Sequence, residues 1–129
     1  MVSVQSIMTN SVVSVKPETP IFDALNLLVK SRISGVPVVD RENRVVGIFS
    51  EKDVLEMLID KNSDIKKTVD DYMTRDVVCF TEEDNAVDIC KFFIKNDLRR
   101  VPIVKDGKLV GIVSRRNIVE LILEEKNKI

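Results

Sequence analysis

The chain has 129 residues and a mass of 14.6 kDa, which is the length of one ordinary domain. Apolar residues make up 44% of it and charged residues 32%, so the sequence predicts a globule with a buried core. The 20 basic and 21 acidic residues leave a formal charge of −1, which argues against a nucleic-acid binder driven by net charge. No apolar run approaches the roughly 20 residues that cross a bilayer, and the first residues do not read as a signal peptide. We therefore expect a cytoplasmic protein without a membrane partner.

Residues that usually support catalysis and metal binding are scarce. The sequence contains no His, which removes the commonest metal ligand and the usual acid or base at neutral pH. Cys79 and Cys90 are too few for a zinc site, and both stand in apolar patterns. We expect them to be small core residues in a reducing compartment, with a disulfide or a reactive thiol as the alternative. Only four Gly are present and no Gly-rich phosphate loop is seen, so the sequence predicts no enzyme and no metal site.

The sequence repeats itself. Met8-Thr9 recurs as Met73-Thr74, and Val36-Pro37-Val38-Val39 recurs as Val101-Pro102-Ile103-Val104. The offset is 65 residues up to the Val-Pro pairs and 64 at the later glycines, so one residue is missing from the second tight turn. A turn is where a structural repeat tolerates a deletion. We place the repeats at residues 1–62 and 68–129, joined by a polar linker over 63–67.

The first repeat reads β-α-β-β-α after a short helix over 4–8. Residues 12–15 predict a strand, and Thr19 is expected to cap a helix that starts with Pro20. The apolar run 36–39 predicts a strand buried on both faces. Turn residues then lead into its hairpin partner, 45–49. Ser50 is expected to cap a helix over 51–60.

The second repeat follows the same plan after a short helix over 68–73. Its predicted elements are strand 77–80, helix 85–95, hairpin strands 100–104 and 109–113, and helix 115–125 capped by Ser114. A unit of about 60 residues is marginal as an independent core. The predicted fold is therefore of mixed α/β (α+β) class, with both repeats packed about a pseudo-twofold into one globular module and clefts between them.

Three motifs occur in both repeats. The first is Met-Thr followed by a Val-Val strand, and the second is Val-Pro-hydrophobic-Val. The third is Gly-hydrophobic-hydrophobic-Ser-x-x-Asp/Asn, found at residues 47–53 and 111–117. This plan resembles a tandem pair of cystathionine-β-synthase (CBS) domains, known as a Bateman module, over essentially the whole chain.

The resemblance implies a regulatory sensor rather than an enzyme. Similar modules bind AMP, ADP, ATP or S-adenosylmethionine in the two clefts between the repeats, as regulatory ligands and not as obligatory cofactors. Carried over to this sequence, cleft one takes Ser50, Asp53, Val77, Val78, Leu98, Arg99 and Arg100. Cleft two takes Ser114, Asn117, Thr19, Ala24, Ile33 and Ser34.

The residue types suit that chemistry. An Asp in the first turn of a helix can accept hydrogen bonds from both ribose hydroxyls, each worth roughly 1.5–3 kcal/mol. Ser50 can donate to a phosphate or ribose oxygen at a helix start, which favours anions. Arg99 and Arg100 offer forked donors to a phosphate. Val78 and Leu98 can hold a purine ring between them.

The two clefts are not equal. Cleft one has Asp53 where cleft two has Asn117. We expect cleft two to bind ribose more weakly than cleft one, by about 1 kcal/mol or more. Against this, Thr19 and Ser34 lie closer to the family pattern than their counterparts Asp84 and Arg99. Simpler interpretations stay open, because Asp53 can serve only to stabilise its helix and the arginines can be solvated surface. We favour cleft one.

The chain is thus expected to sense an adenine-containing ligand and to transmit its binding to an effector protein. The resemblance also implies a homodimer formed through the helices. One alternative is a structural dimerisation or scaffold module with unoccupied clefts. Another is a nucleic-acid-binding module, which the net charge, a single Tyr and the absence of Trp disfavour.

Overall fold

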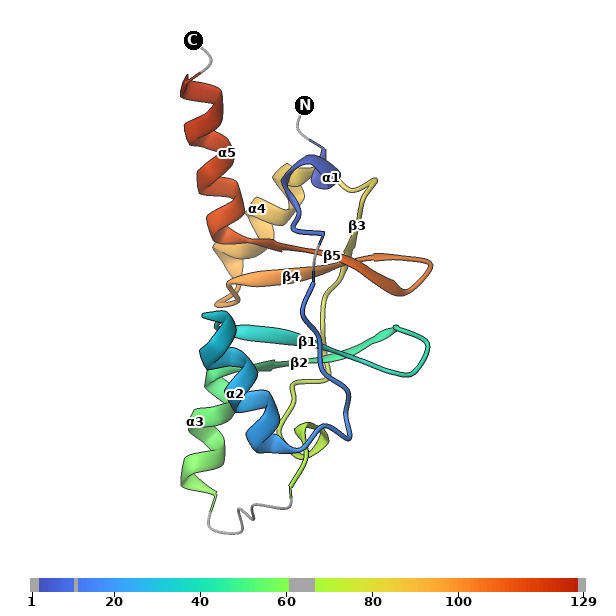
Figure 1. Ribbon diagram of the computed structural model, residues 1–129. Coiled ribbons are helices and arrows are strands. Elements are labelled where there is room, and N and C mark those ends of the chain that lie inside the picture. Colours follow the sequence, from blue (N-terminus) through green and yellow to red (C-terminus); the bar gives the residue numbers. More distant parts are fainter. Residues whose placement is uncertain (1–2, 11, 61–66, 128–129) are drawn as a thin grey trace. The chain divides into compact units, whose positions relative to one another are not determined.

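The computed structural model describes residues 3–10, 12–60 and 67–127, and in it the chain forms two compact units. We name residues 13–77 the central unit, and residues 1–12 together with 78–129 the terminal unit. Each unit combines helices with one small sheet (Figure 1). The mixed helix-and-strand class predicted from the sequence is confirmed.

The central unit is built on a two-stranded antiparallel hairpin. Strand β1 (Gly35–Val39) pairs with β2 (Val45–Ser50), so that Gly35 lies opposite Ser50. All five residues of β1 are buried, as its continuous apolar run predicted. Helices α2 (Ile21–Ser31) and α3 (Glu51–Ile59) flank the hairpin in sequence, and a short 3₁₀ turn, η1 (Val69–Asp71), completes the unit.

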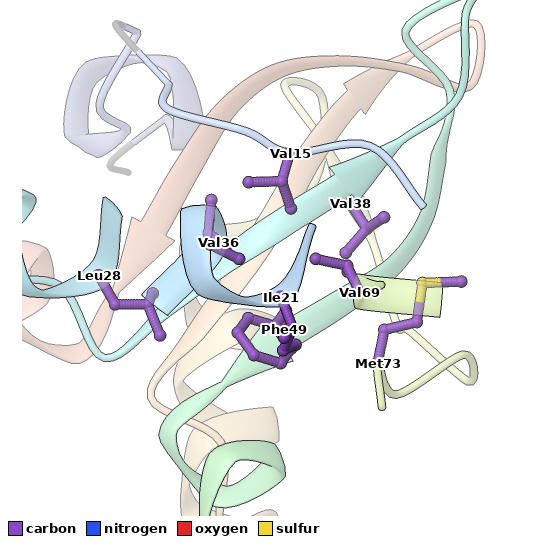
Figure 2. Packing of buried hydrophobic residues seen from close by; sticks show 9 residues of the cluster. Val15, Ile21, Leu28, Val36, Val38, Phe49, Val69 and Met73 are labelled. Carbon is purple, nitrogen blue, oxygen red and sulfur yellow. The ribbon is translucent and has the colours of Figure 1, made fainter. Parts of the chain in front are cut away.

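The core of the central unit joins residues from α2, from both hairpin strands and from the segments around Val15 and Val69 (Figure 2). Helix α2 contributes one face at helical spacing, and both strands add side chains from the hairpin. Val69 and Met73, from the segment that opens the second sequence repeat, complete the cluster. Its buried members are Val15, Ile21, Ala24, Leu28, Val36, Val38, Phe49, Val69 and Met73.

The terminal unit repeats this plan with one additional strand. Strand β3 (Phe80–Thr81) runs parallel to β4 (Arg100–Lys105), which pairs antiparallel with β5 (Lys108–Ser114). The helices are α1 (Val4–Ile7), α4 (Ala86–Lys95) and α5 (Arg115–Asn127). The buried core cluster contains Val4, Ile7, Ala86, Ile89, Phe93, Val101, Ile103 and Val113.

The opening segment of each sequence repeat packs in the unit that holds the other repeat's hairpin. Thr9 exchanges two backbone hydrogen bonds with Ile112 of β5, at 2.8 and 3.1 Å. Thr74 does the same with Ile48 of β2, at 2.8 Å in both directions. The compact units therefore cut the chain at different places from the sequence repeats 1–62 and 68–129, whose boundaries stay a prediction. Residues 63–66 of the expected linker lie outside the described residues.

Two local predictions are wrong. Residues 12–15 form no strand, because only Val15 pairs, through bonds with Pro37 and Val39. Thr19 does not cap α2: its Oγ1 accepts from the backbone N–H of Lys16, and Pro20 is the N-cap without a side-chain bond. Val15 thus bonds to β1 without forming a longer strand. The hydroxyl of Thr19 binds the backbone of Lys16 and so does not cap α2. The predicted strand 77–80 is also shorter, since β3 begins only at Phe80.

Candidate functional site

The Ser-x-x-Asp motif of the central unit forms a reciprocal cap at the start of α3. Ser50 is the N-cap residue and Asp53 the third residue of the helix. The Oδ2 atom of Asp53 accepts from the backbone N–H of Ser50 at 2.8 Å and from its hydroxyl at 3.1 Å. The capping role predicted for Ser50 is confirmed.

A third donor to Asp53 comes from Thr74, in the segment that opens the second sequence repeat and packs on the first hairpin. The hydroxyl of Thr74 donates to Oδ1 of Asp53 at 3.0 Å. Asp53 is only 4% exposed, and three of the roughly four acceptor positions of its carboxylate are occupied. The carboxylate is therefore held in one orientation, and donors from the described residues leave one acceptor position on Oδ1 open. Sequence reasoning did not assign Thr74 to the site, although the repeated Met-Thr motif marked the position.

The terminal unit carries the same cap with an amide in place of the carboxylate. The Oδ1 atom of Asn117 accepts from the backbone N–H of Ser114 at 2.8 Å and from its hydroxyl at 3.0 Å. In return, the backbone N–H of Asn117 donates to Oγ of Ser114 at 3.2 Å. Ser114 thus caps α5 as predicted, and the repeated motif builds the same local structure twice.

The candidate residues from the loops before the Val-Pro strands lie next to these caps. The backbone N–H of Glu51 donates to the carbonyl of Ser34 at 2.9 Å. In the terminal unit, the N–H of Arg115 donates to the carbonyl of Arg99 at 3.0 Å. Arg100 lies opposite Ser114 in the β4–β5 ladder. The structure therefore brings Ser34 to the Ser50 cap, and Arg99 and Arg100 to the Ser114 cap.

The other candidates differ in how much surface they offer. Val78 and Leu98 are 46% and 40% exposed, which leaves both side chains open to contact with a planar ring. Thr19, Ile33 and Val77 are half-buried. Ala24 is 0% exposed within the core of the central unit, so the expectation that it contacts a ligand does not fit the structure. Its place on the inner face of α2 accounts for its small size instead.

Arg115 closes the end of a neighbouring helix. Its guanidinium donates to the carbonyls of Leu98, Phe93 and Asn96 at 2.9, 3.0 and 2.9 Å. These carbonyls lie at and just beyond the C-terminus of α4, where the helix leaves acceptors unpaired and favours a cation. Arg115 also borders a surface depression of about 510 Å³ beside the end of α4. The positive charge of Arg115 thus fixes the segment that leads to Leu98 and Arg99.

The described ranges show neither a group of three or more metal-binding side chains nor a helix long and apolar enough to cross a membrane. Cys79 and Cys90 are both half-buried free thiols. Burial raises the pKa of Cys79, which keeps that thiol protonated and weakly reactive at neutral pH.

Two repeats of this hairpin-and-cap plan define a tandem-domain architecture. The chain belongs to the CBS domain family, whose model matches residues 4–60 and 69–124. It is 33% identical over 119 residues to the uncharacterized protein MJ1225 of Methanocaldococcus jannaschii, an alignment covering 92% of this chain and 42% of that protein. This chain therefore spans less than half the length of that relative.

Two solved structures that this chain resembles contain ligands. CBSX2 of Arabidopsis thaliana, crystallised in complex with AMP, is 35% identical and superposes with a TM-score of 0.89, over 98% of this chain and 99% of that one. The CBS domain pair of protein MJ0100, in complex with 5′-methylthioadenosine and S-adenosyl-L-methionine, is 27% identical. Its TM-score is 0.84, over 97% of this chain and 98% of that one.

Proposed function

We propose that this protein is a regulatory module that binds an adenosine-containing ligand and transmits the binding to a partner protein. The observation that carries the proposal is the buried Asp53 carboxylate, which Ser50 and Thr74 hold in one orientation with an acceptor position open. The ligands of the two related structures share an adenine and a ribose diol. The open position on this fixed carboxylate is suited to accept a hydrogen bond from one hydroxyl of such a diol, rather than from both as the sequence suggested.

The remaining candidates receive roles in the same proposal. Val78 and Leu98 contact the purine, and the backbone at Val77 and the Ser50 hydroxyl contact its polar edge and the ribose. Arg99 and Arg100 donate to a phosphate. A second site uses Ser114 and Asn117 with Thr19, Ile33 and Ser34. Which of these residues meet on one ligand stays a prediction, as do the effector protein and the cytoplasmic location.

The test is a thermal-melting titration of the full chain with adenosine, AMP, ATP and S-adenosylmethionine. Ligand at about 100 times its dissociation constant adds about 2.7 kcal/mol of stability, which raises the melting temperature by several degrees. The informative variant is Asp53→Asn, because Asn117 shows that an amide at this position keeps the cap intact. We expect it to weaken adenosine binding by about tenfold or more, since a charged acceptor is lost.

Asp88→Asn is the matched control. Asp88 is the third residue of α4 as Asp53 is of α3, but its side chain is exposed. It should remove one negative charge, as Asp53→Asn does, without changing any ligand-induced shift in melting temperature. If none of the four compounds raises the melting temperature of the wild-type chain, the proposal fails. It also fails if the ligand raises the melting temperature of Asp53→Asn by as much as that of Asp88→Asn.

Two exposed apolar helix faces, one in each unit, support self-association as a second function. Helix α3 exposes Leu55, Leu58 and Ile59, and α5 exposes Val119, Ile122 and Leu123. Each set has the i, i+3, i+4 spacing of one helix face, and the two sets occupy equivalent positions in the repeats. We propose that these faces form a homodimer interface. Sedimentation equilibrium of wild type and of Leu58→Glu with Ile122→Glu tests it: a dimer should become a monomer, and a wild-type monomer would contradict the proposal.

A further inference from the structure

Helix α3 is bonded at both ends to one short segment of the chain, residues 68–75, which we name the strap. Near the start of the helix, Oδ1 of Asp53 accepts from the hydroxyl of Thr74 at 3.0 Å. At its end, Oδ2 of Asp60, the C-cap residue, accepts from the hydroxyl of Tyr72 at 2.9 Å. The two carboxylates are seven residues apart, about two helical turns, which places both on the side of α3 that faces the strap.

Apolar packing alone holds α3 only weakly. Among the residues of this helix Asp53 is the one that is buried, and Val54 and Met57 are half-buried against the core of the central unit. The three other apolar side chains of α3 are exposed. Because buried apolar faces supply most of the stability of helices in proteins, the two hydroxyl bonds carry much of what fixes α3 in place.

The strap itself is rigid and anchored. It begins with the 3₁₀ turn η1, and Val69 and Met73 belong to the core cluster of the central unit (Figure 2). Arg75 donates to the backbone carbonyl and to the carboxylate of Asp70, at 2.9 and 2.8 Å, which ties the end of the strap to its start. Both hydroxyl donors to α3 therefore belong to one fixed piece of chain.

The contact between Tyr72 and Asp60 has a third member. The ammonium group of Lys67 lies 3.8 Å from Oδ2 of Asp60 and 5.6 Å from the centroid of the Tyr72 ring. Partial burial, the bond to Asp60 and the negative charges of Asp60 and Asp71 raise the pKa of Tyr72. The phenol therefore stays protonated at neutral pH and donates a charge-assisted hydrogen bond to the Asp60 carboxylate.

The terminal unit cannot form the second of these bonds. Ile7 stands at the position of Tyr72 in the first repeat and has no hydroxyl, and Glu124, the counterpart of Asp60, is exposed. The bond at the helix end is thus a property of the unit that carries Asp53, and not of the repeated plan.

From this we infer that Tyr72 and Asp60 are positioning residues for the adenosine site, because they hold α3 against the strap and so keep the Asp53 carboxylate in its binding orientation. The inference rests on the proposed function, since it concerns the affinity of that same site. Thermodynamic linkage makes the effect reciprocal, so a ligand on Asp53 strengthens the bond between Tyr72 and Asp60 by the same factor. The ligand then also steadies the end of α3, which carries Leu58 and Ile59 of the proposed dimer face.

The first experiment is calorimetric titration of the full chain with AMP and, separately, with S-adenosylmethionine. Tyr72→Phe removes the hydroxyl and keeps the ring. We expect it to raise both dissociation constants by the same factor, about threefold to tenfold, because the affected contact is to the ribose that both compounds share. Ser6→Ala is the matched control, since it removes a hydroxyl that donates to the carbonyl of Ser3 in the opening segment of the other repeat. It should change both constants by less than about twofold.

A double-mutant cycle tests whether Tyr72 acts through Thr74. Replacing Thr74 with Val cuts the connection between the strap and Asp53. Tyr72→Phe should therefore raise the dissociation constants much less in the Thr74→Val chain than in the wild-type chain. If the two effects simply multiply, Tyr72 acts independently of Thr74 and the inference is wrong.

Tyr72 also reports the reverse direction, because it is the single Tyr of a chain without Trp. Tyrosine labelled with ¹³C at Cζ gives one NMR signal that needs no assignment. Saturating AMP should move this signal in the wild-type chain, and most of the movement should be lost in Thr74→Val. A movement of the same size in saturated Thr74→Val would mean that the ligand affects Tyr72 directly, which contradicts the positioning role.

The outcomes separate this inference from the proposed function. If Tyr72→Phe lowers the melting temperature of the ligand-free chain but leaves both dissociation constants unchanged, the strap is only structural. The inference then fails while the proposed function stands. If the wild-type chain binds no adenosine compound, both fail. Asp60→Asn keeps an acceptor for Tyr72 and should retain more affinity than Asp60→Ala, so equal losses in these two variants would also overturn the inference.

Discussion

The carbonyl oxygen of Thr74 lies 2.7 Å from the point where a Cβ on residue 47 would stand. Because Gly47 has no Cβ, the backbone at Thr74 can lie directly against β2. We predict that Gly47→Ala lowers the free energy of unfolding by about 1–3 kcal/mol, because a backbone atom cannot move aside as a side chain can. Urea denaturation measures the change.

Gly111→Ala is the natural comparison for this substitution. The nearest atoms to its added Cβ belong to the flexible side chain of Met8, at 2.6 and 3.0 Å, and the Thr9 carbonyl is farther away at 3.2 Å. We expect a loss of less than about 1 kcal/mol, since Met8 can take another rotamer. Equal losses for both glycines would contradict the backbone argument.

Replacing Thr74 with Val removes the hydroxyl that donates to Asp53 while keeping the shape of the side chain. We predict a loss of about 1–2 kcal/mol in the free energy of unfolding, because a buried carboxylate loses one of three donors. Thr9→Val is the control, since Thr9 holds the equivalent position and donates no such bond to Asn117 among the described residues. It should stay within about 0.5 kcal/mol of wild type. A Thr74→Val protein as stable as Thr9→Val would show that the bond to Asp53 contributes nothing.

Arg32 ends α2 in the left-handed conformation, with φ 53° and ψ 45°. Side chains other than Gly pay for this conformation through contact of Cβ with the backbone. Arg32→Gly is therefore expected to raise the free energy of unfolding by about 0.5–1 kcal/mol. Lys30→Gly, two residues earlier and within the helix, should lower it by about 1 kcal/mol. Chemical denaturation of both variants checks the opposite signs, and destabilisation by Arg32→Gly would refute the prediction.

Arg115 and Arg116 are neighbours with very different surroundings. Arg115 donates to three carbonyls at the end of α4, whereas the side chain of Arg116 is 88% exposed and forms an ion pair with Glu120, at 3.4 Å. We predict that Arg115→Ala costs about 1.5–3 kcal/mol of stability and that Arg116→Ala costs less than about 0.5 kcal/mol. Hydrogen exchange should also show faster opening at the end of α4 in Arg115→Ala alone. Similar behaviour of the two variants would mean that the carbonyl contacts carry no stability.

The features predicted well from the sequence are local ones. Both hairpins and the caps at Ser50 and Ser114 depend on residues within a few positions of one another, where turn and capping preferences are strong. The bond between Thr74 and Asp53 spans 21 residues and left no local signal. The repeated Met-Thr motif indicated that Thr74 occupies a special position, but it did not indicate that Asp53 is the partner of Thr74. The sequence repeat would be the same whether the Met-Thr segment packed on the hairpin of its own repeat or on that of the other repeat.

Misassigned residues have a similar physical explanation. Ala24 stands in a family-like position, yet its burial in the core depends on how α2 rests on the hairpin. Residues 12–15 have strand-like composition, but only Val15 reaches a partner strand. In both cases tertiary packing overrode the local preference.

The exchange of opening segments determines how such a chain can be divided. A fragment ending at residue 62 would lack Val69 and Met73, and the first hairpin would expose part of the core that they cover. A fragment of residues 13–77 would keep that core whole. A protein with only one repeat could complete its core by accepting the opening segment of a second molecule. In evolutionary terms, gene duplication would then have converted a segment-swapped dimer of single repeats into one continuous polypeptide.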